Sequence, residues 1–398
     1  MSIRTIKPEE RAAADLLRKM VYLSAETEGY QERLADDLAQ EEAYEGVWAA
    51  FDGRGKMCSV AGVLDYSVRF DGHTVPMGGV AGIATPAEER RKGYVRGLFE
   101  VILPAMREEG KVFSFLYPFS FEFYRKFGYE LCYTPNRVTA PMDLFCEYRM
   151  PERAEQVFPG GDMAELLTVY EAFTLDKNLP LVRDIASMRA RAEHDPYITK
   201  HYAYLNRDEN GAPDAYMLCS AEDGDGGDIL KIREMAWTTP EGMRAMLGLI
   251  GALAPEFETL KWDAPGGVCL PALIGDAFEV SAARPAYGMN RILHVPRALA
   301  LLKAPAQPGR VTLAVTDDAL PANTGVYAVE WENGAVTSVK PSGAAADLET
   351  DVQTLAQLVT GFLTPAEALL KRGVTVNGSA KALEALFPHK DLYIAEYF

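Results

Sequence analysis

The sequence "GIATPAEERRKGYVRGL", residues 82–98, passes from an apolar stretch through a basic run into a helical pattern. The apolar residues that lead into it predict a strand over 75–84. From residue 93 to residue 109 apolar residues recur at helical spacing, with Leu98, Val101, Ile102 and Met106 on one face. A strand that leads almost directly into a helix is typical of a mixed sheet with helices packed on its faces.

The basic run Arg90, Arg91 and Lys92 stands where this helix begins. The first turn of a helix has unpaired backbone N–H groups and carries the positive end of the helix dipole. Gly93 would let a ligand approach the backbone closely, and Arg96 adds a further cation. The junction therefore predicts a site for a pyrophosphate group. The alternative is that the basic run is a solvated charge run on a loop. Its position at a strand-to-helix junction favours the phosphate site over this alternative.

The residues around this junction predict the rest of a first domain. A helix is expected over 8–22, and a hairpin is expected from strands at 47–52 and 58–71. A buried strand at 111–118 and a short helix within 122–130, ending in a turn at Gly128, follow the long helix. This order predicts an α/β domain over residues 1–150.

A second domain, residues 151–284, repeats that order. We expect helices within 163–194, two strands around an Asn-Gly turn within 198–223, a strand at 229–237, a helix over 240–253 and a strand at 259–265. Its strand-to-helix junction reads "MAWTTPEGM" and has no basic run. We therefore expect this domain to be a scaffold that binds no cofactor.

A third domain, residues 285–398, begins where short β segments follow one another. The last two segments flank Asn333-Gly334, a hairpin signal, and helical patterns follow at 351–373 and 379–388. The final residues, "KDLYIAEYF", are apolar enough to predict a buried strand that ends at Phe398. The order predicts an α+β domain.

Composition narrows the range of partners. The 398 residues include 40 Lys and Arg against 57 Asp and Glu, a formal net charge of −17. This charge repels nucleic acid and anionic membranes and attracts cationic substrates. The charged start "MSIRTIKPEE" predicts no export signal and a cytoplasmic protein, and no apolar run approaches the roughly 20 residues of a membrane span. Five scattered cysteines are expected to be reduced and buried, and neither they nor the five histidines show metal-ligand spacing, so no metal is expected.

The motif Arg90-x-x-Gly93, preceded by "GGVAGIATP" and followed by an amphipathic helix, resembles motif A of the GCN5-related N-acetyltransferases (GNAT). Val95 stands where that motif ends in Gly or Ala. The segments "RRKGYVRGL" and "FYRKFGY", with the chain length and the Tyr397-Phe398 end, resemble the Eis (enhanced intracellular survival) family of aminoglycoside acetyltransferases. The resemblance implies two GNAT domains followed by a sterol-carrier-like domain, acetyl-CoA as the acetyl donor, and a homo-hexamer.

The resemblance also implies the roles of individual residues. Tyr124 would be the general acid and the main-chain carboxylate of Phe398 the general base. The alternative for Tyr124 is a purely structural place in an aromatic core. Backbone amides near the end of the strand would hold the thioester carbonyl, and the basic loop would hold the cofactor phosphates; together these cofactor-binding residues are Ile83, Ala84, Thr85, Arg90, Arg91, Lys92, Gly93, Tyr94 and Val95. Glu26 and Glu28 are acceptor-binding candidates from their charge and position.

Three functions are compatible with these features. The first is acetyl transfer to polycationic amines, such as aminoglycosides, polyamines or the lysines of a peptide. The second is a catalytically idle CoA-binding regulator, and the third is a lipid carrier that uses the last domain. The motif Arg90-x-x-Gly93 together with Tyr124 and the terminal Phe398 favours acetyl transfer.

Overall fold

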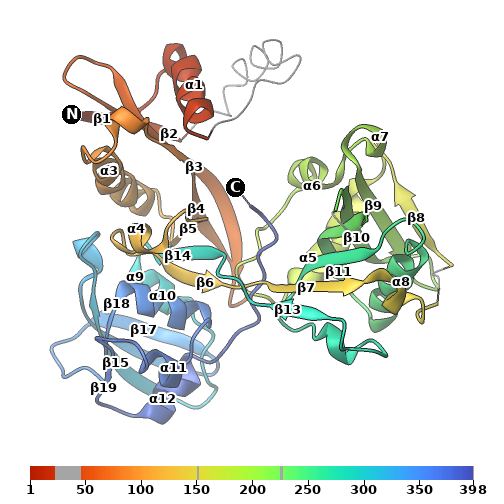
Figure 1. Ribbon diagram of the computed structural model, residues 1–398. Coiled ribbons are helices and arrows are strands. Elements are labelled where there is room, and N and C mark those ends of the chain that lie inside the picture. Colours follow the sequence, from red (N-terminus) through yellow and green to blue (C-terminus); the bar gives the residue numbers. More distant parts are fainter. Residues whose placement is uncertain (23–45, 150–151, 225–226, 398) are drawn as a thin grey trace.

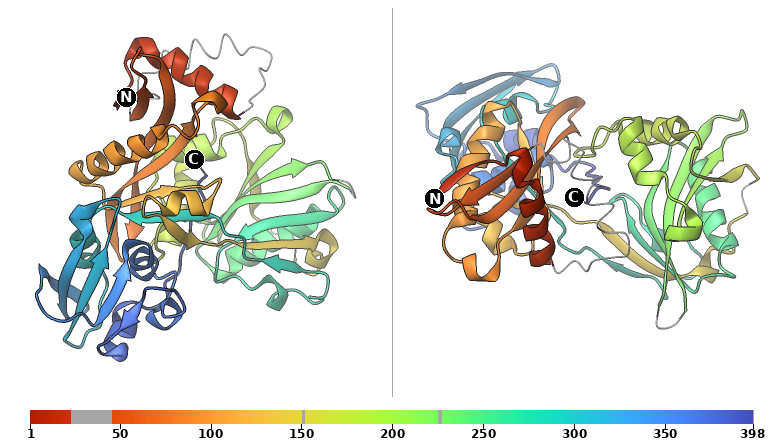
Figure 2. Two further views of the ribbon diagram at one scale, coloured as in Figure 1. Left: turned by 60° about the vertical axis from the view of Figure 1, so that its left-hand side comes forward. Right: turned by 90° about the horizontal axis from the view of Figure 1, so that it is seen from above.

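The computed structural model describes residues 1–22, 46–149, 152–224 and 227–397, and their strands form three mixed sheets with helices on their faces (Figure 1). Two sheets have seven strands and the third has five. The predicted mixed α/β fold is therefore confirmed. Two further views show the second sheet in a lobe of its own, with the C-terminal segment between it and the first sheet (Figure 2). The first and third sheets share one hydrophobic core.

The first sheet has the strand order β1-β2-β3-β4-β5-β14-β6. Helix α3 packs against β1, β2 and β3 of this sheet and buries the side chains of Leu98, Ile102 and Met106. The elements are β1 (Ser2–Thr5), α1 (Arg11–Tyr22), β2 (Val47–Phe51), β3 (Met57–Phe70), β4 (His73–Ala84), α3 (Tyr94–Glu108), β5 (Phe113–Leu116), α4 (Phe121–Arg125), β6 (Glu130–Tyr133) and β14 (Gly288–Ile292). The predicted elements of this domain are confirmed to within a few residues.

The second sheet has the order β13-β7-β12-β11-β10-β9-β8. Helix α5 packs against β10 and β11, and helix α8 packs against β9, β10 and β11. The elements are β7 (Asn136–Pro141), β8 (Ala154–Val157), α5 (Met163–Thr174), α6 (Ile185–Ala192), α7 (Pro196–Thr199), β9 (His201–Arg207), β10 (Pro213–Glu222), β11 (Ile229–Trp237), α8 (Pro240–Ala252), β12 (Thr259–Ala264) and β13 (Ser281–Ala283).

The third sheet has the order β17-β16-β15-β18-β19. The hairpin of this sheet turns at Asn333-Gly334, as the Asn-Gly pair predicted. The φ angles of Asn333 and Gly334 are positive, at 53° and 88°. The elements are α9 (Val295–Ala300), β15 (Gly309–Thr316), β16 (Gly325–Glu332), β17 (Ala335–Pro341), β18 (Leu348–Asp351), α10 (Val352–Thr360), α11 (Pro365–Ala368), β19 (Thr375–Val376) and α12 (Ala380–Leu386).

Two strands are exchanged across the expected boundaries at residues 150 and 284, one from the first domain to the second sheet and one from the third domain to the first sheet. Strand β7, before residue 150, pairs with β12 of the second sheet. Strand β14, after residue 284, lies between β5 and β6 of the first sheet. The boundaries expected from the sequence therefore do not separate the sheets. They could not be placed correctly, because an alternating apolar pattern identifies a strand but not the strand with which it pairs.

The exchanged strand β14 carries Arg291, whose side chain is fully buried. Its guanidinium lies 2.6 Å from the carboxylate of Asp317, also fully buried, and donates a hydrogen bond to the carbonyl of Phe127. The residue after Phe127 is Gly128, with φ +79°, and a Cβ at this position would meet the same guanidinium. The third domain is thereby tied to the turn that follows α4.

Two expectations from the sequence are corrected by the structure. The segment after α12 forms no strand up to Tyr397; its backbone makes a single bridge, between Asn178 and Leu392. Its other polar contacts go to all three domains, including Lys390 with Val359 and Asp71 and Glu396 with Arg183. Its apolar composition therefore did not indicate strand pairing. Of the five cysteines, Cys146 and Cys269 are exposed, while the other three are buried.

Candidate functional site

The parallel strands β4 and β5 separate after a short stretch of pairing. They pair only from Met77 with Phe113 to Gly79 with Phe115. Beyond Gly79, β4 runs on to Ala84 and stays paired with β3, with an irregular register near Gly82, whose φ is +58°. No strand among the described residues pairs with the β5-facing edge of β4 beyond Gly79, so its peptide groups border an opening between the two strands.

The residues expected to hold a thioester lie at the end of β4. Ile83 is half-buried, and its carbonyl accepts a 3.0 Å hydrogen bond from the hydroxyl of Tyr22. Ala84 is fully buried, and the hydroxyl of Thr85 lies 2.8 Å from that of Ser59. These contacts fix the end of the strand in place.

The loop after β4 is organised around the buried carboxylate of Glu89. This carboxylate pairs with Lys56 and Lys92, both at 2.8 Å, and these hydrogen bonds lower the pKa of Glu89 to about 2. Arg90 donates to the carbonyl of Thr85 at 3.1 Å. Two of the three predicted phosphate-binding cations therefore also brace the loop, while Arg91 is exposed at its turn, with φ +63°.

Helix α3 begins at Gly93, which has φ +87° and no side-chain cap. A Cβ built on Gly93 would meet nothing within 4 Å. The first i,i+4 bond of the helix runs from Gly97 to Gly93, so the amides of the first turn remain available to a ligand. Tyr94 and Val95 are half-buried against the core, and a hydrogen bond with Cys58 raises the pKa of Tyr94 to about 12.

The corresponding helix of the second domain, α8, has a different beginning. Thr239 caps it by accepting from the amide of Gly242 at 2.9 Å. The buried carboxylate of Asp214 accepts from the Thr239 hydroxyl at 2.9 Å and would lie 2.8 Å from a Cβ on Gly242. A capped helix start beside a buried carboxylate disfavours a phosphate ligand.

Tyr124 lies on α4, directly after β5, and is only 4% exposed. Ring centroids of Phe123, Phe119 and Phe99 lie 5.2, 5.5 and 6.1 Å from its own. Burial, with a smaller contribution from the nearby Tyr22, raises the pKa of Tyr124 well above its ordinary value. The phenol is thus held protonated at neutral pH, as a proton donor requires. The aromatic cluster fits a structural role equally well.

The C-terminal segment reaches the same region. The ring of Tyr397 lies 4.4 Å from that of Tyr117, whose hydroxyl donates to the carbonyl of Glu396. Burial raises the pKa of Tyr22, with a smaller contribution from Tyr397, and Tyr22 contributes in the same direction to the raised pKa of Tyr124. The predicted base, Phe398, and the predicted acceptor residues Glu26 and Glu28 lie outside the described residues.

A cavity of about 290 Å³ lies between the second domain and the C-terminal segment. Three carboxylates line it, and each already has a cationic partner: Glu222 with Lys231 at 2.8 Å, Glu234 with Arg183 at 2.7 Å, and Asp263 with Arg137 at 2.7 Å. These walls offer balanced charge and are not a simple acidic groove.

Comparison with protein families gives three matches along the chain. Two acetyltransferase (GNAT) domain models match residues 2–132 and 179–292, and a sterol carrier protein domain model matches residues 295–395. The chain is a GNAT N-acetyltransferase with two GNAT domains and a sterol carrier protein domain. GNAT domains use acetyl-CoA as the acetyl donor. A search of the curated proteins finds no match.

Solved structures share the fold of this GNAT protein over its whole length. A probable N-acyltransferase from Enterococcus faecalis V583 has a TM-score of 0.88 and 19% identity, and the match covers 100% of this chain and 99% of that one. A GCN5-related N-acetyltransferase from Anabaena variabilis has a TM-score of 0.87 and 20% identity, with 100% of both chains covered. Eis1 from Mycobacterium abscessus has a TM-score of 0.80 and 18% identity, again with 100% of both chains covered.

Several residues of the candidate site were not indicated by the sequence. Glu89 reads as one of many surface acids, yet it braces the basic loop. Tyr22 and Tyr117 join the site from α1 and from the end of β5. Among the described residues no group of three or more His, Cys, Asp or Glu could hold a metal ion. No helix within the described ranges is both long and apolar enough to cross a bilayer.

The open backbone at Gly93 gives a matched test of the phosphate site. Gly93→Ala should raise the dissociation constant for acetyl-CoA about tenfold to 100-fold, because a methyl group would stand where a phosphate approaches the helix start. Gly211, with φ +82° and nothing within 4 Å of a built Cβ, is the control. Alanine is strained to a similar degree at both positions, so the two variants should have similar melting temperatures. Titration calorimetry should show weaker acetyl-CoA binding only for Gly93→Ala. Equal affinity in the two variants would remove the site from the start of α3.

Proposed function

We propose that the protein transfers the acetyl group of acetyl-CoA to a primary amine of a polycationic acceptor, such as an aminoglycoside, a polyamine or a lysine side chain. The observation that carries the proposal is the buried phenol of Tyr124 directly after β5, beside the opening between β4 and β5. The GNAT family matches supply the acetyl chemistry. The net charge of −17 favours cationic acceptors.

The proposed reaction needs no covalent enzyme intermediate. The acceptor nitrogen attacks the thioester carbonyl, a C–N bond forms and the C–S bond breaks. Backbone amides near Ile83, Ala84 and Thr85 would bind the oxygen on which negative charge develops. Tyr124 would donate a proton to the departing thiolate. The carboxylate of Phe398 would accept the proton of the amine, directly or through a water.

The cofactor residues proposed here are those of the β4–α3 loop. Amides at the start of α3 would bind the phosphates, with Arg90, Arg91 and Lys92 around them. Lys92 and Arg90 would contribute from positions that Glu89 and Thr85 already fix. The capped start of α8 supports the proposal that the second domain binds no cofactor. The hexamer remains a prediction.

The two alternatives fit the structure less well. An idle CoA-binding regulator would not need a buried phenol beside the opening of the sheet. A lipid carrier would need apolar side chains facing a cavity, whereas Leu355, Leu358 and Val359 of α10 are fully buried in the core. Acetyl transfer is therefore the proposed function of the whole chain.

A thiol-release assay tests the proposed function. With acetyl-CoA and a polyamine, an aminoglycoside or a lysine-containing peptide, the protein should release CoA thiol at a rate that depends on the amine. Mass spectrometry should find an acetylated amine in equal amount. Binding of acetyl-CoA without turnover on any of these amines would instead favour the regulator.

Tyr124→Phe should lower kcat about 100-fold to 10,000-fold with little change in KM, because it removes a proton donor and keeps the ring. Tyr129→Phe is the matched control, since this phenol lies in the same cluster but is bonded to the hydroxyl of Ser114 at 2.7 Å. The control should lower stability and leave kcat near that of the unmodified protein. Full kcat in the Tyr124→Phe protein would show that Tyr124 has only a structural role in the aromatic core.

Extension of the chain beyond Phe398 should abolish acetyl transfer and leave acetyl-CoA binding intact. The extension converts the carboxylate into an amide and moves the new terminus away by about 3.3–3.6 Å per residue. The same residues added at the amino terminus are the control, with melting temperatures measured for both. Wild-type turnover by the carboxy-extended protein would show that another group is the base.

A further inference from the structure

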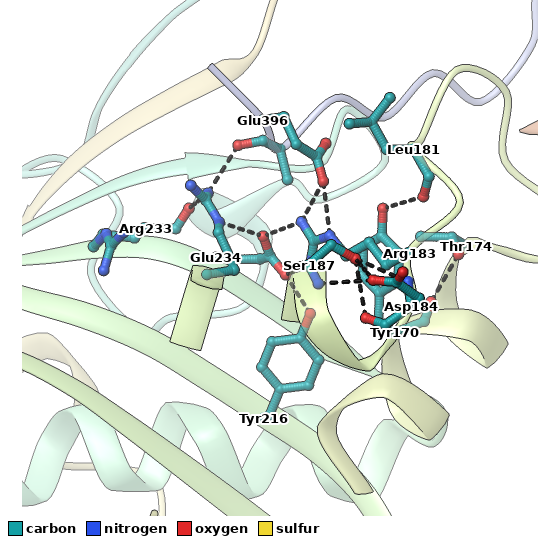
Figure 3. Close-up of polar contacts among 12 residues, drawn as sticks. Tyr170, Thr174, Leu181, Arg183, Asp184, Ser187, Tyr216, Arg233, Glu234 and Glu396 are labelled. Atoms are coloured by element: carbon teal, nitrogen blue, oxygen red, sulfur yellow. Dashed lines mark hydrogen bonds and ion pairs between the residues drawn. The ribbon is translucent and has the colours of Figure 1, made fainter. Parts of the chain in front are cut away.

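The second domain holds a buried cluster of charged side chains that the proposed reaction does not use (Figure 3). Arg183, just before α6, makes a bidentate ion pair with Glu234 of β11, at 2.7 and 2.8 Å. Arg191 of α6 approaches the same carboxylate at 3.1 Å, and the hydroxyl of Tyr216 donates to it. The side chain of Glu234 is 0% exposed and that of Arg183 is 3% exposed.

Within the second domain, this cluster has an excess of positive charge. Burial favours the neutral form of Glu234, but the charges of Arg183 and Arg191 lower its pKa to about 2, so the carboxylate is ionised. Two guanidinium groups therefore face one carboxylate. A buried guanidinium without a counter-charge is costly, so the cluster favours a second anion beside it.

The C-terminal segment supplies that anion. Glu396 accepts from Nε of Arg183 at 2.7 Å, and only 15% of its side chain is exposed. The preceding carbonyl, that of Ala395, accepts from Arg191 at 2.8 Å. Both arginines thus bind the second domain with one part of the guanidinium and the C-terminal segment with another.

The cluster lies at the opening of the second sheet. Pairing of β11 with β12 ends at Ile232 and Trp262, and Glu234 comes two residues later on β11. This position matches the opening between β4 and β5 in the first domain. Tyr117 of the first domain donates to the carbonyl of the same residue, Glu396. The segment is therefore fixed from both domains at one residue.

We propose that Arg183, Arg191 and Glu234 are positioning residues that hold Glu396 and Ala395, so that the end of the chain is presented to the acetyl-transfer site of the first domain. The inference rests on the proposed function in one respect, the use of Phe398 as the base. The second domain then acts through the opening of its sheet, as a receptor for an acidic segment of its own chain.

The test replaces Glu396 by Ala and by Gln, which leaves Arg183 paired with Glu234 and spares the fold of the second domain. Asp391→Ala is the matched control, since Asp391 is an acidic residue of the same segment whose pair with Lys177, at 2.9 Å, is exposed. All variants end at Phe398, with no added residues. Trimming by a carboxypeptidase, followed by intact mass, reports how often the segment leaves its site; kcat, KM, acetyl-CoA affinity and melting temperature are measured in parallel.

Glu396→Ala should speed trimming about tenfold to 100-fold and lower kcat by a similar factor, with acetyl-CoA affinity and melting temperature near those of the control. Glu396→Gln keeps an acceptor for Arg183 and should give intermediate values. Unchanged trimming in Glu396→Ala would overturn the inference that the cluster holds the segment. Faster trimming with full kcat would overturn the positioning role.

Failure of the proposed function would appear differently. In that case the unmodified protein would not acetylate any amine, whereas trimming would still report whether the cluster holds the segment. Faster trimming of Glu396→Ala would then show that the cluster holds the segment, while the segment has no role in acetyl transfer.

Discussion

The site depends on the separation of β4 from β5 after Gly79. Parallel strands satisfy each other's peptide groups, so a strand that leaves its neighbour exposes amides that only a ligand or solvent can bind. β4 can do this without being lost from the sheet because β3 stays paired with it up to Ala84. The strand β5 leads directly to α4, so the same separation places Tyr124 beside the exposed edge.

The first two domains use one architecture for different purposes. The start of α3 is uncapped at Gly93, whereas Thr239 caps α8 beside the buried Asp214. The opening of the second sheet contains Glu234 and its two arginines, and the C-terminal segment contacts them there. The repeated fold thus has an uncapped helix start in the first domain, and in the second it holds a segment of its own chain at the opening of the sheet.

Sequence patterns predicted most helices and strands, since those patterns depend on residues near one another. The α3 helix, the Asn333-Gly334 hairpin and the basic loop before Gly93 are examples. The strand exchange was not predictable, because β14 lies far along the chain from its neighbours β5 and β6 and its pattern would fit either sheet. The strand predicted for the C-terminal segment was wrong for a related reason: its apolar residues pack between domains and not in a sheet.

The sequence by itself determined the local elements, the Arg90-x-x-Gly93 loop with its helix start, and the GNAT resemblance that singled out Tyr124. Each of these is encoded by residues within a few turns or strands of one another. The tertiary structure alone decided which distant groups meet. Glu396 and Arg183, at 2.7 Å, are 213 residues apart in the chain, and either could have been a surface charge. Only the folded chain buries them together, and burial makes their pairing matter, because a charge removed from water needs a partner.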